Sequence, residues 1–492
     1  MDNKKSAITY IHIKGVSKII TGKLKIVFIS AAVLLLAVGA DLTLKYGVRR
    51  PVEIKQTTTT ANEFYVAPPP TGSSSGNGSI ENPWDLLTAG NQTQIIKPGD
   101  IIWLRGGTYL EPITIKLYGT ESAPITIRNY NRERATFDAK GVPNSFNLSN
   151  SMFIRLWGLE VMDSLRSSVG QQIYSIFTDG GATGPKASTT AYINIVSHDA
   201  GMGIANGREA YGNIFYYNGR NKLEHGIYWQ NNYPQNGIIK VIQDNIILNS
   251  SAYGIHSYGS LRGELDGFLF EGNTFVNNSF LLGGGWAVDN VTIKDNFFYQ
   301  KELKDGGYVD WLNYGLQLGY NDEGMSTVNN NVSITNNYIA YPIPLWLRMS
   351  FRKMTMRSNH LIQTRHFPVQ IDANNASGFF ISGPYDIDQN TYYQRPGEGP
   401  FYFSSGYRTL GQWQTETGFD LHSTALTTTP PNIVFIRPNK YESGRANITI
   451  YNWSKINNVD VDVSGILNTG DAYEIHNAQD YYGDIVTGIY QG

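Results

Sequence analysis

Two short segments of this 492-residue sequence contain residue types that suit proton transfer. The segment LEHGIYWQN contains His225 and Tyr228, and the later segment AYGIHSYG contains His256 and Tyr258. An imidazole can accept a proton and a phenol can donate one, and general acid–base catalysis needs both roles. The two segments also share a Gly-Ile-aromatic pattern, which suggests that they occupy equivalent positions in a repeating structure.

This set of residues matches the chemistry of a polysaccharide lyase. Such an enzyme needs a base for the proton beside a uronate carboxylate, an acid for the leaving oxygen, and positive charge near the carboxylate. Either histidine could be the base and either tyrosine the acid. Arg348, Arg262 or a bound Ca²⁺ would neutralise the carboxylate. For each histidine alone, the competing interpretation is an ordinary hydrogen-bonded surface or turn residue.

One loop segment offers carboxylates for a cation. Asp322 and Glu323 in YNDEG supply oxygen ligands of the kind that Ca²⁺ prefers, although two adjacent acids also suit an exposed turn. The chain has no cysteine, so a thiolate metal site and a disulfide framework are both excluded.

The elements that position these residues are short repeated strands. Gly or Pro precedes an alternating segment in GIANG, GIYWQN, GIHSYG, GWAVDN, GLQLGY, PLWLRM and PVQIDA, which begin at residues 203, 226, 254, 285, 315, 344 and 368. A second series with an asparagine near the end of a strand alternates with the first. A period of about 22 to 31 residues without helices predicts a parallel β-helix, in which each coil buries its apolar face by stacking on the next.

The alternation of side chains along a strand predicts which residues face outward. The aliphatic residue after each Gly or Pro should face the core, and its neighbour should face out. We expect an outer column of Ala205, Tyr228, His256, Gln317, Trp346 and Gln370, and a second column of Gln230, Tyr258, Arg348 and Asp372; the register of GWAVDN is left open. Flat aromatic rings beside hydrogen-bonding groups favour a carbohydrate-binding groove over an ordinary solvent-exposed sheet face. We expect Arg262, in the loop after the His256 strand, to belong to the same site, although this loop could also be a solvated turn.

The second series predicts an asparagine ladder. Because the repeats are in phase, side-chain amides should stack at one corner and bond to each other and to the turn backbone. The residues are Asn245, Asn273, Asn296, Asn337, Asn359 and Asn390.

Several segments carry a resemblance to a known family. FYVAP, NPWDL, PGDIIWLRGGTY, APITIRNY and ERATFDAKG resemble the opening coils of bacterial right-handed parallel β-helix proteins of the pectate-lyase-like superfamily, and LGQWQTETGFDLHS resembles the segment that closes them. The resemblance covers residues 62–423 and implies the fold. The superfamily contains lyases, hydrolases, epimerases and members without known activity, so it does not imply one reaction. No catalytic set of a better-known member can be transferred residue by residue.

The N-terminus suggests export. Six lysines precede the apolar run IVFISAAVLLLAVGA at residues 26–40, which is a membrane anchor if it extends to Leu44 or a cleaved signal otherwise. This arrangement would place the N-terminus in the cytoplasm and the rest of the chain outside. Residues 56–492 carry a net charge of −9, which argues against nucleic acid as a partner.

These observations predict an all-β chain with three parts. Residues 1–60 would form the cytoplasmic basic segment, the anchor or signal helix and a threonine-rich tether; residues 61–425 would form a right-handed parallel β-helix; residues 426–492 would form a small β-sandwich-like domain or an irregular part of the helix. We expect an exported, carbohydrate-active protein, most simply a lyase on an acidic polysaccharide. The alternatives are a non-catalytic polysaccharide-binding protein at the cell surface and a glycoside hydrolase.

Overall fold

The computed structural model describes residues 8–16, 24–25, 61–110, 112–142, 145–165, 174–178, 189–221, 223–232, 237–259, 264–300, 311–320, 328–372, 380, 383–403, 406–483 and 485–492. The chain divides into two compact units. One is Ala61–Thr428, and the other combines Met1–Thr60 with Thr429–Gly492.

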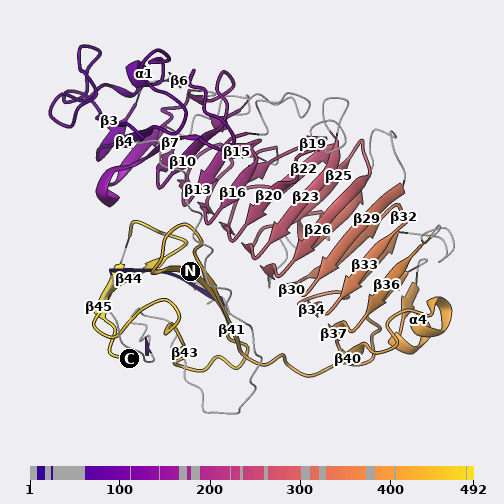
Figure 1. Cartoon of the computed structure of the whole chain (residues 1–492). Coiled ribbons are helices and arrows are strands. Elements are labelled where there is room, and N and C mark those ends of the chain that lie inside the picture. The colour runs from indigo at the N-terminus through magenta and orange to yellow at the C-terminus, as the bar shows by residue number, and fades with distance from the viewer. Residues whose placement is uncertain are drawn as a thin grey trace. The chain divides into compact units, whose positions relative to one another are not determined.

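The unit Ala61–Thr428 is a parallel β-helix with three sheets (Figure 1). The first sheet contains, in order, β3 (Glu63–Val66), β4 (Ile101–Leu104), β7 (Ile125–Asn129), β10 (Ile154–Trp157), β13 (Ala191–Ile193), β16 (Glu209–Tyr211), β20 (Lys240–Gln243), β23 (Leu265–Glu271), β26 (Val288–Lys294), β29 (Val328–Thr335), β33 (Met354–Arg357) and β36 (Tyr385–Asp388). Two short strands join it at the side, β19 (Asn231–Asn232) and β32 (Ser350–Phe351).

The second and third sheets follow the first within each coil. The second contains β5 (Gly107–Tyr109), β8 (Ala135–Asp138), β11 (Glu160–Met162), β14 (Val196–His198), β17 (Ile214–Tyr216), β21 (Ile246–Leu248), β24 (Thr274–Val276), β27 (Phe297–Tyr299), β30 (Tyr338–Tyr341), β34 (His360–Gln363), β37 (Thr391–Tyr393) and β40 (Thr424–Leu426). The third contains β6 (Ile113–Thr114), β9 (Phe146–Asn147), β12 (Tyr174–Phe177), β15 (Met202–Ala205), β18 (Ile227–Tyr228), β22 (Ile255–Gly259), β25 (Phe280–Gly284), β28 (Tyr314–Tyr320), β31 (Ile343–Arg348), β35 (Val369–Asp372), β38 (Phe401–Phe403) and β39 (Gly406–Arg408).

Short helices accompany the coils. They are α1 (Leu86–Ala89), the 3₁₀ turns Tyr130–Arg132 and Trp311–Asn313, and α4 (Leu410–Thr417). Helix α4 lies in the segment that we expected to close the β-helix. Its Trp413 is buried and stacks on Phe401 of β38 with ring centroids 4.5 Å apart, so the helix packs on the core of the terminal coils.

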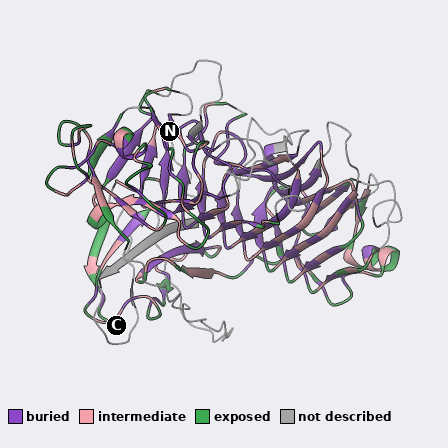
Figure 2. Cartoon of the chain, turned by 45° about the horizontal axis from the view of Figure 1, so that its top comes forward, coloured by how far each residue is buried: buried purple, intermediate pink, exposed green. Residues whose placement is uncertain are grey.

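The core lies inside the coils, as Figure 2 shows by the buried residues along the strands. In the third sheet the residues Ile227, Ile255 and Leu316 are buried and belong to one in-register stack, which confirms the prediction for these side chains. Full burial of such a side chain stabilises the fold by about 1.5–3 kcal/mol.

The structure corrects two details of the repeat. Each coil has three strands and not two. The segments of the second predicted series each contain two strands, with the asparagine at the corner between them. Asn245, for example, lies between β20 and β21. The strand of the third sheet in the GWAVDN coil is β25, which precedes that segment. Phe280, Leu281 and Leu282 of β25 are all buried, so the strand lacks the apolar–polar alternation by which the other strands were found.

The asparagine ladder is confirmed. The six predicted side chains, extended at one end by Asn213, donate from Nδ2 to Oδ1 of the next member over 2.8–3.0 Å, and the last member, Asn390, donates to Asp420. The Oδ1 of each of the six predicted members also accepts the backbone N–H of the preceding asparagine, and Asn213 Oδ1 accepts that of Ile195. The residue before each ladder member has a positive φ, which turns the chain at the corner.

The second unit contains a five-stranded antiparallel sheet. Its order is β41 (Ile433–Pro438), β42 (Arg445–Tyr451), β1 (Ile8–Val16), β44 (Ala472–Asn477) and β45 (Ile485–Ile489), and β2 (Leu24–Lys25) pairs with β43 (Asp460–Val461). A β-sandwich is not seen in the described residues of this unit. Strand β1 was not predicted, although ITYIHIKGV contains the β-branched and aromatic residues typical of strands.

The apolar run at residues 26–40 lies outside the described residues, and so does its extension to Leu44. Across the residues that are described, no helix combines the length and the apolar character needed to cross a membrane. The anchor or signal stays a prediction. The pairing of β1 with β42 and β44 puts residues 8–16 in one sheet with the C-terminal strands, which conflicts with the expectation that the N-terminus lies across a membrane from the rest of the chain.

One lysine of the first sheet is buried in the β-helix, and within the described part of the chain it contacts no carboxylate. Lys240 Nζ donates to Gln230 O over 2.5 Å and to Asn206 Oδ1 over 3.3 Å, and it lies 5.7 Å from the centre of the Trp229 ring. Burial lowers the pKa of Lys240 to about 7. The folded state therefore holds this proton less tightly than the unfolded state does.

Asn296→Ala tests the ladder. The substitution removes donors to Asn337 Oδ1 and Phe270 O and leaves buried partners unsatisfied. We expect the free energy of unfolding to fall by about 3 kcal/mol, measured by urea denaturation. The matched control, Asn82→Ala, changes an exposed asparagine outside the ladder and should have little effect. Equal losses for the two variants would contradict a structural role of the ladder.

Lys240→Met tests the buried charge. The lowered pKa destabilises the fold fully below pH 7, and this destabilisation is relieved as the pH rises towards the unfolded value of 10.5. Between pH 7 and pH 9.5 the Lys240 contribution to unfolding free energy should rise by about 3 kcal/mol, and the variant should lack this rise. Urea denaturation at both pH values measures the difference. Lys116→Met, at an exposed lysine, should keep the wild-type dependence.

Candidate functional site

The outer face of the third sheet has the predicted register. The in-register outer column is Ala205, Tyr228, His256, Leu281, Gln317, Trp346, Gln370 and Tyr402. The strand pairing confirms the predicted register of Ala205, Tyr228, His256, Gln317, Trp346 and Gln370, and the structure adds Leu281 from β25 and Tyr402 from β38. Of this column, Ala205, Leu281 and Gln317 are buried. Arg348 and Asp372 are also in register, two residues further along their strands.

The repeated glycines allow the coils to stack at this face. A Cβ on Gly203 would lie 2.4 Å from Gly226 O, and a Cβ on Gly226 would lie 2.7 Å from Gly254 O. Because the carbonyl of the next coil occupies this space, a side chain here would displace the backbone. The repeated Gly-Ile pattern therefore follows from backbone contact between coils, and the residue after it carries the outward side chain.

Two histidines form the centre of the candidate site. His225 precedes β18, and His256 lies in β22 on the next coil. His256 Nδ1 and His225 Nε2 are 2.9 Å apart, and the two rings meet edge to face at 83°. We call these two residues the histidine pair. The sequence predicted both residues as candidates, but only the coil stacking showed that they form a hydrogen bond.

Three tyrosines surround the histidine pair. The ring of Tyr228 stacks on His225 at 5.9 Å, and the rings of Tyr253 and Tyr258 lie 4.8 Å and 5.4 Å from that of His256. Tyr253 was not predicted as a site residue. It precedes Gly254, where no strand alternation indicated its direction.

Burial keeps the histidine pair neutral. It lowers the pKa of His225 to about 3, and burial together with the nearby His225 lowers the pKa of His256 well below its usual range. In a neutral pair one ring donates to the other, so one of the two outer nitrogens is a donor and the other an acceptor. These outer nitrogens, His225 Nδ1 and His256 Nε2, are buried and make no hydrogen bond within the protein.

A buried ion pair holds the turn before the histidine pair. The Glu224 carboxylate accepts from the backbone N–H of Arg220 over 2.8 Å and from its Nε over 2.9 Å. Both side chains are largely buried. Glu224 therefore anchors the turn that precedes His225.

The glutamines differ in their exposure. Gln230 and Gln317 are buried, and Gln230 Nε2 donates to Tyr258 O over 2.6 Å. Gln370 is partly exposed and donates to Asp372 Oδ1 over 3.0 Å. Arg262, Asp322 and Glu323 lie outside the described residues, so their predicted roles stay predictions.

The structure does not bring Arg348 to the histidine pair. Three coil steps separate His256 from Trp346, which corresponds to about 14 Å, and Arg348 lies two residues beyond Trp346 on its strand. Arg348 Cζ lies 4.0 Å from the centre of the Trp346 ring, and Nε is 3.3 Å from Asp372 Oδ2. Arg348 was expected in the catalytic set with the histidines, and the structure instead places it at a different position on the sheet.

A pair of carboxylates was missed by sequence analysis. Asp266 of β23 and Asp289 of β26 are in register on adjacent coils, and burial raises the pKa of both. Asn290 donates to Asp266 over 2.9 Å, and Asn330 donates to Asp289 over 3.1 Å. The repeated LDG and VDN segments were the available signal. In the part of the chain that is described, no three His, Asp or Glu side chains group closely enough to hold a metal ion.

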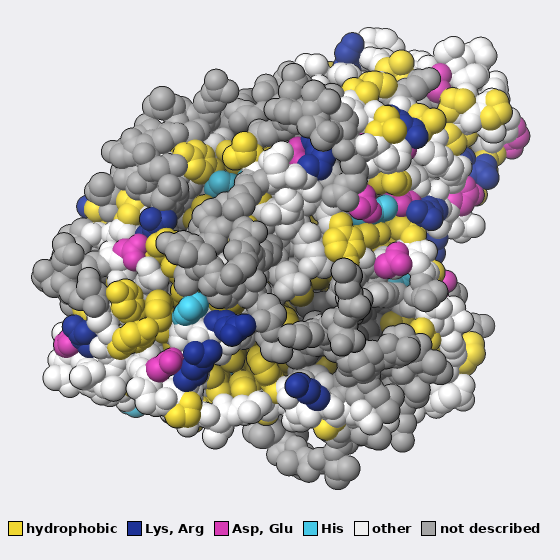
Figure 3. Space-filling view, turned by 180° about the vertical axis from the view of Figure 1, so that it is seen from behind, with side chains coloured by type: hydrophobic (Ala, Val, Ile, Leu, Met, Phe, Trp, Pro, Cys, Tyr) yellow, Lys and Arg dark blue, Asp and Glu magenta, His cyan; other side chains and the backbone are white. Residues whose placement is uncertain are grey.

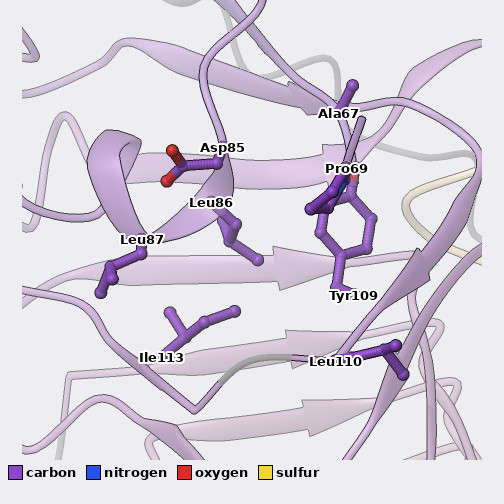
Figure 4. Close-up of a pocket in the computed structure, with 8 residues that line it drawn as sticks. All are labelled: Ala67, Pro69, Asp85, Leu86, Leu87, Tyr109, Leu110 and Ile113. Atoms are coloured by element: carbon purple, nitrogen blue, oxygen red, sulfur yellow. The ribbon is translucent and has the colours of Figure 1, made fainter. Parts of the chain in front are cut away.

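A small apolar pocket lies at the opening coils and not at the histidine pair (Figure 4). Its lining includes Leu86, Leu110 and Ile113. Asp85 belongs to this lining too, but its carboxylate caps α1 by accepting the backbone N–H of Thr88. The face in Figure 3 shows acidic and basic side chains interspersed over its described part, without a continuous patch of one charge.

Comparison with known proteins gives one family match. Residues 64–341 match the model of the family described as "Pel9A-like, right handed beta helix region". No curated protein matches the sequence.

Solved structures that are similar in fold include several carbohydrate-active proteins. A GH136 lacto-N-biosidase from Eubacterium ramulus is 11% identical over 67% of this chain and 67% of that chain, with a TM-score of 0.35. Pectate lyase Pel9A is 19% identical over 68% and 80%, with a TM-score of 0.35. A rhamnogalacturonan lyase is 14% identical over 70% and 84%, with a TM-score of 0.36. These similarities do not indicate an activity for this protein.

The family match and the observed coils agree on the architecture. The matched range runs from β3 to β30, which includes both histidines and most of the asparagine ladder. Because the match spans more than half of the chain, this protein belongs to the Pel9A-like right-handed β-helix family.

Proposed function

We propose that this protein binds an acidic, uronate-containing polysaccharide on the outer face of the third sheet and cleaves it by β-elimination at the histidine pair. The observation that carries the proposal is the pair itself. It is neutral, it is surrounded by tyrosines, and its outer nitrogens make no hydrogen bond within the protein. Such nitrogens suit proton transfer with a bound substrate.

In this proposal His256 is the base. When His256 Nδ1–H donates to His225 Nε2, the lone pair lies on His256 Nε2. The proposed step requires the substrate to reach this buried nitrogen, which then removes the proton beside the uronate carboxylate. The electrons of that C–H bond form a carbon–carbon double bond as the glycosidic C–O bond breaks. Tyr258 gives its phenolic proton to the leaving oxygen. The product is an unsaturated uronate, and no other reactant is consumed.

His225 acts in this scheme as a positioning residue. Its Nε2 accepts from His256 and thereby selects the tautomer with a basic Nε2. Tyr228 stacks on the His225 ring, and the Glu224–Arg220 pair holds the turn that precedes His225. The positive charge at the uronate carboxylate would come from Arg262 or a bound Ca²⁺, since Arg348 lies several coils away.

We further propose that the protein acts outside the cytoplasm. The lysine-rich start and the apolar run at residues 26–40 support export. The pairing of β1 with β42 and β44 opposes it, because an anchor would separate these strands and cleavage would remove β1. A polysaccharide at or beyond the cell surface would then be the partner.

A non-catalytic role in polysaccharide binding is the second candidate. A general base works best when its pKa lies near the operating pH, and burial lowers the pKa of both histidines far below that range. The aromatic side chains of the outer face would serve binding in either case. A hydrolase is less favoured, because the Asp266 and Asp289 side chains occupy the first sheet and not the outer column.

His256→Ala tests the base. General bases typically contribute about 10²- to 10⁴-fold in rate, so turnover of the folded variant should fall by that order. The melting temperature should also fall, because buried His225 Nε2 loses its hydrogen-bond partner. The full-length protein would be incubated with alginate, pectate, hyaluronan and chondroitin, with calcium or with a chelator. Ultraviolet absorbance would follow the unsaturated products. His360→Ala, at an exposed histidine of the second sheet, is the matched control and should keep wild-type turnover.

The other outcomes of this experiment separate the candidates. Retention on immobilised polysaccharide without any ultraviolet signal would support the binding role. New reducing ends without unsaturation would point to a hydrolase. Wild-type turnover in His256→Ala would remove His256 from the mechanism.

The pH dependence of kcat/KM provides a separate test. His256 must be unprotonated to act as a base, and its pKa is lowered, so activity should persist as the pH falls below 6.5. The acid limb should appear only near the lowered pKa. An acid limb centred at or above pH 6.5 would show that an ordinary exposed group controls the rate.

A further inference from the structure

A second polar and aromatic cluster occupies the outer face of the third sheet, several coils from the histidine pair. It contains Tyr314 of β28, Trp346 and Arg348 of β31, and Gln370 and Asp372 of β35. We call these five residues the arginine platform. We propose that the arginine platform is a separate subsite that binds the carboxylate of an acidic sugar. This sugar and the sugar cleaved at the histidine pair would belong to the same polysaccharide molecule. The link to cleavage rests on the proposed function, but anion binding by the platform does not.

The spacing of the coils excludes a shared sugar. The outer column passes from His256 through Leu281 and Gln317 to Trp346, and each step between parallel strands is about 4.8 Å. Arg348 lies a further two residues along the strand, so its backbone is roughly 16 Å from that of His256. One sugar cannot contact both sites. An extended oligosaccharide along the outer column can contact both if it covers about four coil levels.

The contacts within the platform hold Arg348 in place. Trp346 stacks on Tyr314 with ring centroids 4.0 Å apart, and the guanidinium lies 4.0 Å from the centre of the Trp346 ring. The Tyr314 hydroxyl donates to Gln370 Oε1 over 3.2 Å, and Gln370 Nε2 donates to Asp372 Oδ1 over 3.0 Å. A cation ordered before binding loses less conformational entropy when it meets a ligand.

The chemistry of the platform suits a carboxylate. A planar guanidinium has five donors in a fork that matches carboxylate geometry, and it stacks on aromatic rings as Arg348 does. Trp346 Nε1 is buried and makes no hydrogen bond within the protein, so it is a further donor at this place. The neighbouring ring of Tyr402 is partly exposed and is an apolar surface of the kind that packs against sugar rings.

A ligand carboxylate can replace the Asp372 carboxylate in the ion pair with Arg348. The Arg348 and Asp372 side chains are 26% and 37% exposed, and ion pairs with such exposure contribute little to stability. A ligand carboxylate can therefore take the place of Asp372 at small cost. Asp372 competes with the ligand in this picture, and removal of its charge should strengthen binding.

The test compares Arg348→Gln and Asp372→Asn in the full-length protein. Binding of size-defined oligogalacturonates and alginate oligomers, from two to six units, is measured by calorimetry, with neutral xylan oligomers alongside. Arg348→Gln should weaken binding of acidic oligomers of about four units or more by roughly tenfold and leave dimers and neutral oligomers unchanged. Asp372→Asn should strengthen binding of the same long acidic oligomers. Arg357→Gln, in an ion pair on the first sheet, is the matched control and should change neither.

Each outcome decides the proposal. If the ion pair is only structural, both variants weaken binding together or change only the melting temperature, and the subsite is refuted. Equal losses for short, long and neutral oligomers, or wild-type protein that binds no acidic oligomer, also refute it. If the wild type binds long acidic oligomers as expected but forms no unsaturated product, the subsite stands and β-elimination at the histidine pair fails.

Discussion

The parallel pairing between successive coils is the interaction on which the rest of the structure depends. Each strand bonds to the strand one coil away, residue by residue, so a given position of one coil lies directly over the same position of the next. This register places Ile227 and Ile255 in the core and Tyr228 and His256 on the outer face. A slip of one residue would exchange the two sets, and the burial of the aliphatic side chains prevents it.

Two features reinforce this register at the corners and strand starts. The asparagine ladder links consecutive coils through side-chain and backbone hydrogen bonds, so each corner is held at the height of one coil. Glycines such as Gly203 and Gly226 leave room for the carbonyl of the next coil. The ladder satisfies buried polar groups, and the glycines remove steric hindrance, so both allow the coils to approach to the spacing of a sheet.

The same register governs the chemistry of the outer face. Residues on adjacent coils can form hydrogen bonds, as His225 and His256 do, whereas residues three coils apart belong to different binding positions. Burial then sets the protonation state, because neither histidine has a carboxylate partner within its described contacts and both remain neutral. The histidine pair and the arginine platform are consequently separate functional elements on one sheet. Their distance suits a polymer better than a small molecule.

The repeat, the core stack, six members of the outer column and six members of the asparagine ladder could be predicted from the sequence, because each depends on local alternation and on a period that is visible in one dimension. The sequence did not reveal the third strand of each coil, the place of β25, or strand β1, where alternation is weak or the partner strands lie far away in the chain. The polar residues that meet could not be predicted in this way. The stacking of the coils joins His225 to His256, aligns Asp266 with Asp289, and separates Arg348 from the histidine pair. Contacts and pKa values depend on the coil on which each side chain lies and on how deeply the side chain is buried. The spacing of a single motif predicts neither the coil partner nor the depth of burial.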